Sequence, residues 1–240
     1  MSAQQLGLVT PRPAPRVPGI DLRCCDVREI VTNLEEQTVS LIVADPPWDL
    51  YKQEAGGAEP ELHYPCLTAR DIGDHLELAM FGLRDDGRLA LWTCWPLLVE
   101  VLDGRELPPW LRVPGLIWRT GGAWTKTGTL GVGYHWRGHS EPVLIGTPYC
   151  ASSGRPKANL RSGYASEPEE HSRKPAAWMA DWIRAWVPPG GLVLDLYAGL
   201  GSVAEAVVLA GESRRYLGAE IDPARHAAAS TKVFHAWRRG

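Results

Sequence analysis

The stretch Leu41-Ile42-Val43-Ala44-Asp45-Pro46-Pro47-Trp48 decides how this chain folds. Its first four residues are small or branched and apolar, which is typical of a strand buried on both faces inside a parallel sheet. The strand ends at an acid followed by two prolines, which donate no N–H group and disfavour a helix. We therefore expect Asp45 and Trp48 on a stiff, extended loop at the carboxyl end of a core strand, where open α/β sheets bind their ligands.

This loop carries a carboxylate, carbonyl oxygens on a rigid turn and a flat aromatic ring. The oxygens accept hydrogen bonds from an amino group, and the ring stacks on a planar base. Together they suit a site that grips the amino edge and the face of a nucleobase. The alternative is an ordinary strand-to-loop turn with an incidental Trp48, because short motifs also arise by chance.

The composition is that of a globular protein with one large core: 240 residues, 45% hydrophobic and 22% charged. Five cysteines without a CxxC pair indicate a reduced, cytoplasmic protein with no structural metal site. The sequence has no signal segment and no apolar run that could cross a bilayer, so we expect no membrane association. With a formal charge of −3, a nucleic-acid-binding protein must concentrate its positive charge locally.

Strand and helix patterns alternate along the chain, which predicts an α/β fold with a single doubly wound, Rossmann-like sheet of about seven strands. Strands are expected at 20–24, 39–44, 88–92, 116–118, 142–145, 192–196 and 215–219, with a turn at 85–87. Helices are expected at 27–36, 67–81, 97–102, 175–186, 202–210 and 223–237, and loops at 49–63, 120–133 and 147–170. Residues 1–18 read as a flexible proline-rich tail and residues 19–240 as one domain.

The C-terminal half contains a strand ending at Asp195, the turn Gly199-x-Gly201, a helix, and a strand ending at Glu220. The glycines allow a tight turn and close approach to a ligand, and the helix start offers free N–H groups. An acid about 20 residues further on suits a ribose diol. The alternative is a purely structural turn, since the fuller three-glycine spacing of a nicotinamide site is missing.

Asp-Pro-Pro-Trp combined with a later glycine turn resembles the amino-group nucleic-acid methyltransferases that use S-adenosylmethionine. From about residue 20 to 230, the chain is similar to the MT-A70 family of adenine-N6 methyltransferases. The stretches that carry this resemblance are Cys24-Cys25-Asp26-Val27-Arg28, Ala44 to Asp49, His63-Tyr64-Pro65, Leu91-Trp92, Gly133-Tyr134-His135-Trp136-Arg137, His139-Ser140-Glu141 and His171-Ser172-Arg173-Lys174-Pro175. A catalytic loop before the glycine turn is the circularly permuted order of that family and of the β-class DNA methyltransferases.

The resemblance implies S-adenosylmethionine as cofactor and assigns residues to it. Asp26 is expected to accept a hydrogen bond from the cofactor adenine, with Val27 beside it, while Asp26 also caps a helix. Lys174 is expected to pair with the cofactor carboxylate; the alternative is an exposed surface lysine. The remaining expected cofactor residues are His171, Ser172, Asp195, Tyr197, Gly199, Gly201 and Glu220.

The resemblance also implies how the acceptor base is handled. Asp45 and the Pro46 carbonyl are expected to accept hydrogen bonds from the adenine amino group, on a loop stiffened by Pro47, while Trp48 stacks on the base. Further substrate contacts are expected at Tyr64, Tyr134, Trp136, Arg137, Arg155, Lys157 and Arg161. For the last three, which would contact phosphate, a solvated loop is the alternative. No catalytic metal is expected.

The C-terminal glycine turn departs from the MT-A70 pattern and looks like the β-class DNA enzymes. This mixture favours adenine-N6 methylation of DNA by a cytoplasmic protein of prokaryotic or viral origin. Two alternatives stay open: the same reaction on RNA, and a non-catalytic nucleic-acid-binding subunit of a methyltransferase complex. The segment 147–170 is short where the β-class enzymes carry a target-recognition region, so we expect sequence selectivity to be limited or supplied by a partner. A homodimer and a heterodimer both stay open.

Overall fold

A computed structural model describes residues 16–48, 66–102, 107–128, 138–151, 160–168 and 173–240, with only the backbone described for 100–102. Most of the predicted flexible tail lies outside these ranges. Val17, however, is 7% exposed and belongs to the core, so the packed part of the chain includes at least this residue of the predicted tail.

The described strands form one mixed sheet of eight, in the order β1-β8-β7-β2-β3-β5-β4-β6. They are β1 (Ile20–Cys24), β2 (Val39–Ala44), β3 (Leu83–Trp92), β4 (Leu116–Lys126), β5 (Ser140–Pro148), β6 (Gly163–Ser166), β7 (Leu192–Asp195) and β8 (Arg215–Glu220). The five strands from β1 to β3 in this order are mutually parallel, whereas β5 runs antiparallel to both β3 and β4. The predicted α/β doubly wound fold is confirmed.

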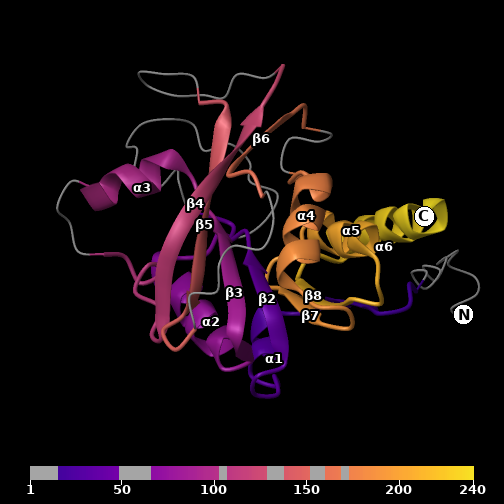
Figure 1. The fold of residues 1–240 in the computed structure, drawn as a ribbon, viewed down its shortest axis with the longest axis horizontal. Helices are drawn as coiled ribbons and strands as arrows, with labels where there is room; N and C mark the ends of the chain where they lie inside the picture. Colours follow the sequence, from indigo (N-terminus) through magenta and orange to yellow (C-terminus); the bar gives the residue numbers. More distant parts are fainter. Residues whose placement is uncertain (1–15, 49–65, 103–106, 129–137, 152–159, 169–172) are drawn as a thin grey trace, which may run out of the picture.

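Helices cover both faces of the sheet (Figure 1). They are α1 (Val27–Val31), α2 (Ala69–Met80), α3 (Trp95–Leu102), α4 (Ala176–Trp186), α5 (Ser202–Ala210) and α6 (Pro223–Arg239). Helices α4, α5 and α6 pack against one another in series, and α1 contacts α2. The result is a three-layer arrangement of helices, sheet and helices.

Strand β2 explains why the sheet is covered on both sides. All six of its residues are buried. Leu41 and Val43 belong to the core cluster beneath α4 and α5, while Ile42 and Ala44 belong to the cluster beneath α2. Alternate side chains of a strand point to opposite faces, so an unbroken apolar run requires a packed layer on each face.

The site lies where the winding of the sheet reverses. From β7 the chain proceeds to β8 on one side, and from β2 it proceeds to β3 on the other, while β2 and β7 are themselves neighbours. The carboxyl ends of both strands therefore flank a topological switch point, where open α/β sheets bind ligands. Asp45 directly follows β2 and Asp195 ends β7.

Several element boundaries differ from the sequence predictions. The predicted loop at 147–170 contains β6, and the predicted loop at 120–133 begins with the continuation of β4. Both segments are rich in glycine and serine, but pairing with a neighbouring strand outweighs that local preference. The predicted turn at 85–87 is an exposed bulge within β3, since Leu83 pairs with Val39 and Arg88 pairs with Leu41. Helix α1 is also shorter than predicted.

Three of the described helices begin with an acid or a threonine at the N-cap, the residue types that favour this position. Asp26 caps α1 and Thr68 caps α2, each in a reciprocal capping box with Glu29 or Asp71, and Asp222 caps α6. Pro175 is the N-cap of α4 rather than its first residue. The side chains of Asp26, Thr68 and Asp222 each accept a hydrogen bond from a backbone N–H group at a helix start, whereas Pro175 makes no such bond.

A glycine at position 201 is required by the turn before α5. Gly201 has a φ of +81°, and a Cβ there would lie 3.1 Å from the Ala229 Cβ and 3.2 Å from the Val233 Cγ2 of α6. We therefore expect Gly201→Ala to lower the free energy of unfolding by about 1–2 kcal/mol or more, the usual cost of a left-handed residue with a side chain. Gly163→Ala is the matched control, because a Cβ at Gly163 meets no atom within 4 Å. Denaturant unfolding of both variants checks this, and equal stability of Gly201→Ala and the wild type would contradict it.

Candidate active site

A cavity of about 470 Å³ opens at the carboxyl ends of the parallel strands. The sequence-predicted residues that line it are Asp26, Val27, Asp45, Pro46, Pro47, Trp48, Lys174, Asp195, Tyr197, Gly199 and Glu220. These residues come from five separate segments of the chain. The structure thus brings the predicted catalytic loop and most of the described cofactor residues to one cavity, with Gly201 just behind it as the N-cap of α5.

Asp45 is held by an ion pair that spans most of the sequence. The Lys174 ammonium lies 2.6 Å from Asp45 Oδ2 and 3.0 Å from Glu141 Oε2. Glu141, on β5, is also paired with Lys126 on β4. The Lys174 side chain is 12% exposed, and its ammonium lies 5.4 Å from the centre of the Trp92 ring. Four charges of alternating sign therefore form a continuous network along one wall of the cavity.

The network controls the protonation of its members. Burial works against the Lys174 ammonium, but the carboxylates of Asp45 and Glu141 raise its pKa above the ordinary value. Burial raises the pKa of Asp45, and Lys174 acts in the opposite direction. Although burial also disfavours the Glu141 carboxylate, Lys174 and Lys126 hold its pKa below the ordinary value. Lys174 thus keeps a charge beside Asp45 and favours the ionised carboxylate there.

Neighbouring Arg173 anchors the segment that presents Lys174. Its guanidinium pairs with Glu205 in the first turn of α5, and both side chains are nearly buried, at 10% and 12% exposed. Because α4 begins only three residues later, this contact fixes the approach of the chain to the cavity.

The loop after β2 is held by its own backbone. The Trp48 N–H group donates to the Pro46 carbonyl at 2.9 Å, and the Leu67 N–H group donates to the Pro47 carbonyl at 3.0 Å. The Trp48 ring meets Trp110 edge-on, with 5.2 Å between ring centres and 69° between planes. Among the described residues, its indole N–H has no hydrogen-bond partner. A carbonyl oxygen has two lone pairs, so the Pro46 oxygen can still accept a second hydrogen bond.

The glycine turn is fastened to two buried acids. Glu220 accepts hydrogen bonds from the N–H groups of Gly199, at 2.7 Å, and Asp222, at 2.9 Å. Asp195 accepts one from the Tyr216 hydroxyl at 2.9 Å. Burial raises the pKa of Asp195 to about 7, although the Tyr216 hydroxyl acts in the opposite direction. Both acids line the cavity and keep lone pairs available for a ligand.

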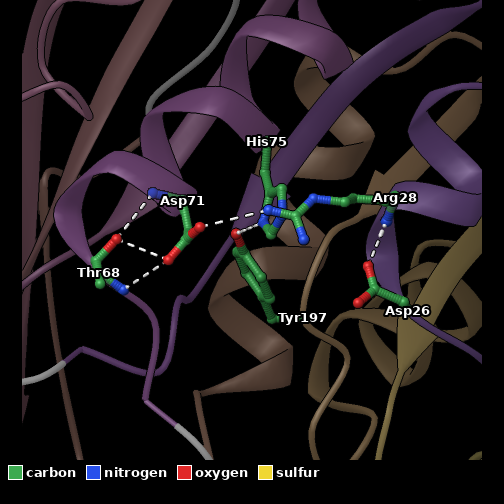
Figure 2. Close-up of polar contacts among 6 residues, drawn as sticks. All are labelled: Asp26, Arg28, Thr68, Asp71, His75 and Tyr197. Atoms are coloured by element: carbon green, nitrogen blue, oxygen red, sulfur yellow. Dashed lines mark hydrogen bonds and ion pairs between the residues drawn. The ribbon is translucent and has the colours of Figure 1, made fainter.

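A polar cluster forms the other end of the cavity, around Asp26 (Figure 2). Asp26 Oδ1 accepts from the Arg28 N–H group at 2.8 Å, and the Arg28 guanidinium reaches Asp71 at 3.4 Å, tying α1 to α2. Beside it, the His75 Nδ1 lies 2.9 Å from the Tyr197 hydroxyl. Burial lowers the pKa of His75, which favours the neutral ring. The cluster fixes the Tyr197 ring against the wall of the cavity.

Some predicted site residues cannot be placed. Tyr64, Tyr134, Trp136, Arg137, Arg155, Lys157, His171 and Ser172 lie outside the described residues. Arg161 is described and exposed, and its carbonyl accepts a hydrogen bond from the Trp178 indole at 3.2 Å. It does not line the cavity. Its predicted contact with phosphate stays a prediction.

Sequence reasoning missed several residues of the cavity wall: Lys126, Glu141, His75, Thr93 and, behind Asp195, Tyr216. Glu141 stands in a stretch that resembles the MT-A70 family, and this was the available signal for it. Lys126 was hidden because β4 was expected to end at residue 118. His75 and Thr93 carry no local signal, since their position depends on packing between distant segments.

Two further findings concern the described residues alone. No group of three or more histidine, cysteine, aspartate or glutamate side chains among them is placed to hold a metal ion. None of their helices combines the length and the apolar character needed to span a membrane.

The family follows from a comparison of the sequence with known families. The model of a family described as DNA methylase (N6_N4_Mtase) matches residues 107–231, slightly more than half of the chain. The chain belongs to the N6/N4 DNA methylase family.

Curated relatives of this chain include MT-A70 proteins. The N(6)-adenosine-methyltransferase MT-A70-like of Arabidopsis thaliana is 27% identical over 178 residues, which are 72% of this chain and 23% of the relative. The human N(6)-adenosine-methyltransferase catalytic subunit METTL3 is 28% identical over 124 residues, 51% of this chain and 19% of the relative. The matched part is thus less than a quarter of either relative. The predicted resemblance to the MT-A70 family is confirmed.

Solved DNA methylases share the fold. The M1.HpyAVI–SAM complex has a TM-score of 0.62 at 18% identity and covers 90% of this chain and 98% of its own. PvuII DNA methyltransferase (cytosine-N4-specific) has a TM-score of 0.63 at 15% identity, and the match covers 92% of this chain and 94% of that protein. The putative DNA modification methylase TTHA0409 of Thermus thermophilus, complexed with S-adenosyl-L-methionine, has a TM-score of 0.64 at 17% identity. The match covers 90% of this chain and 93% of that protein. Because one of these neighbours modifies cytosine, the fold alone does not select the acceptor base.

The raised pKa of Asp195 makes the stability of this methylase depend on pH. The pKa is about 7 when folded against an ordinary value of 3.8, so the folded chain holds an extra proton between about pH 4 and pH 7. The free energy of unfolding should fall as the pH rises through this range and level off above it. Asp195→Asn removes this titration and keeps the shape, so its stability should fall less steeply. Urea unfolding between about pH 5 and pH 8 checks this, and identical slopes for the two proteins would contradict it.

Proposed function

We propose that this protein transfers a methyl group from S-adenosylmethionine to the N6 amino group of adenine in DNA. The observation that carries the proposal is Asp45, which is fixed at the end of β2 by Lys174, 2.6 Å away. Its carboxylate lines the same cavity as the glycine turn and the acids at the ends of β7 and β8. One cavity therefore provides for both the methyl donor and the acceptor base.

The charges of the cavity fit this cofactor, which has a net positive charge. Of the described lining residues, the carboxylates are Asp26, Asp45, Glu141, Asp195 and Glu220, and the cations are Lys126, Lys174 and Arg225. Lys126 and Lys174 are already paired with Glu141 and Asp45. The acids Asp26, Asp195 and Glu220 remain to face a ligand, which suits a molecule with an ammonium, a sulfonium and an amino group.

Each of these acids has a proposed task. Asp26 uses one oxygen to cap α1 and offers the other to the amino group of the cofactor adenine. Glu220 accepts hydrogen bonds from the ribose hydroxyls while its backbone contacts hold the glycine turn. Asp195 orients the methionine end. When bound, S-adenosylmethionine supplies an electrophilic methyl group, and the ring of Tyr197 and the side chain of Val27 flank its adenine.

The residues of the loop prepare the acceptor nitrogen. The lone pair of an aromatic amino group is delocalised into the ring, which makes the nitrogen a weak nucleophile. Hydrogen bonds from this amino group to Asp45 and to the Pro46 carbonyl favour a more tetrahedral nitrogen and stabilise the positive charge that develops on it. Asp45 is also placed to take the proton that the nitrogen loses after transfer. Lys174 orients Asp45, and Trp48 contacts the face of the base.

The choice of acceptor rests on two supports. The family to which the chain belongs is described as DNA methylase, and an acid before Pro-Pro resembles the adenine-type enzymes. RNA is the second candidate, because the curated relatives are named for adenosine, a ribonucleoside. Methyl transfer from labelled cofactor to matched DNA and RNA oligonucleotides, followed by nucleoside mass spectrometry, separates N6-methyladenine from N4-methylcytosine in either polymer.

Removal of the Asp45 carboxylate tests the chemistry. We expect Asp45→Asn to lower kcat by at least about 100-fold, the scale of one preorganised charge contact, while the affinity for the cofactor changes little. Asp21→Asn is the control, because Asp21 is an exposed acid paired with Arg23 on β1. Labelled-methyl transfer and calorimetry provide the two readouts. Wild-type turnover by Asp45→Asn would contradict the proposed mechanism.

Asp26→Ser tests the cofactor end without removing the helix cap. Serine still caps α1 but lacks the second carboxylate oxygen, so cofactor affinity should fall about 10-fold, the scale of one hydrogen bond to a charged group. Asp222→Ser is the matched control, since Asp222 caps α6 and does not line the cavity. If calorimetry gives the same affinity for both variants and the wild type, the assignment of the adenine to Asp26 is wrong.

A further inference from the structure

Thr93 stands beside the catalytic loop and has no role in the chemistry described above. It directly follows β3, which is the parallel neighbour of β2. Val43 and Ala44 of β2 pair with Ala90 and Leu91 of β3, respectively. The same register, extended by two residues, places Thr93 level with Pro46. Thr93 lines the cavity together with Asp45, Pro46 and Trp48.

The Thr93 hydroxyl is buried and unpaired. The residue is 5% exposed, and its Oγ1 has no hydrogen-bond partner among the described residues. Its backbone is fixed, because the Thr93 N–H group donates to the Pro142 carbonyl of β5 at 3.0 Å. With the backbone held, the hydroxyl is directed only by rotation about the Cα–Cβ and Cβ–Oγ1 bonds. A buried hydroxyl without a partner is unfavourable for the fold, and such groups are found where a ligand completes them.

We propose that the Thr93 hydroxyl reads the acceptor base by donating a hydrogen bond to a ring nitrogen that flanks its amino group. This inference rests on the proposed function, since it assigns a second contact to the base that Asp45 holds. In adenine, two ring nitrogens flank the N6 amino group, N1 on the Watson–Crick edge and N7 on the major-groove edge, and both are acceptors. The Asp45 carboxylate would accept a hydrogen bond from the amino group of adenine, and the Thr93 hydroxyl would donate one to the neighbouring ring nitrogen.

The same pair of groups fits guanine less well than adenine and tolerates cytosine. On the Watson–Crick side of the guanine amino group the ring nitrogen is an N–H donor, so the Thr93 hydroxyl would meet it as an acceptor and its own proton would be left without that partner. Cytosine has an acceptor nitrogen beside its amino group, so Thr93 does not by itself exclude it. Thr93 thus selects bases with an amino donor beside a ring acceptor, and it sits on a strand end where its position is rigid.

Thr93→Val is the central test because it separates binding from folding. Valine has the same shape but no hydroxyl, so removing an unpaired buried oxygen should leave the free energy of unfolding unchanged or raise it. The kcat/KM for an adenine oligonucleotide should nevertheless fall, by about 3- to 10-fold for one lost neutral hydrogen bond. Thr231→Val, on the exposed surface of α6, is the control that should keep wild-type kcat/KM. A Thr93→Val variant that is less stable, or equally active, overturns the proposal.

Base analogues identify the atom that Thr93 contacts. Oligonucleotides with 1-deazaadenine or 7-deazaadenine at the acceptor position each lack one ring nitrogen. In the wild type one of these analogues should lower kcat/KM, and in Thr93→Val the same analogue should cause no further loss. Additive losses for both analogues overturn the proposal. The two claims fail separately, because a wild-type protein that methylates no adenine contradicts the proposed function, whatever the behaviour of Thr93→Val.

Discussion

The ion pair between Lys174 and Asp45 is the contact on which the site depends. A buried ammonium is strongly unfavourable unless carboxylates surround it, so Lys174 requires both Asp45 and Glu141 in place. Asp45 follows β2, Glu141 lies on β5, and Lys174 precedes α4. The pairing therefore fixes the antiparallel half of the sheet and the start of α4 relative to the catalytic loop. It also leaves one Asp45 oxygen for an incoming amino group and opposes the burial that raises the pKa of that carboxyl group.

The rest of the cavity follows from the topology of the sheet. Parallel strands bring their carboxyl ends to one edge, and the reversal of winding between β2 and β7 leaves a crevice there. Acids at or just after the ends of β1, β2, β7 and β8 then face a common space. Tyr216 and the N–H group of Gly199 hold two of these acids in place from within the protein. The arrangement suits a positively charged ligand, and it is built entirely on strand ends and helix starts.

The parts of the site that the sequence predicts are those encoded locally. Asp45-Pro46-Pro47-Trp48 after an apolar strand, Asp26 at a helix start, and Asp195 and Glu220 at strand ends all depend on neighbouring residues, and each lies at the cavity. The partner of Lys174 was different. Resemblance assigned it to the cofactor carboxylate, a prediction that stays untested, and the structure pairs it with Asp45. No local pattern connects residues so far apart, and the same holds for Lys126 with Glu141 and for His75 with Tyr197. Strand β6 was missed because its pairing with β4, rather than its glycine- and serine-rich composition, makes it a strand.

A structure of the chain with S-adenosylmethionine bound tests the central claim that one cavity serves donor and acceptor. The account predicts that the cofactor adenine lies at Asp26, the ribose at Glu220 and the sulfonium methyl group toward Asp45, with Lys174 still within ion-pair distance of that carboxylate. A cofactor bound elsewhere on the protein, or in this cavity with its methyl group directed away from Asp45, would contradict the account.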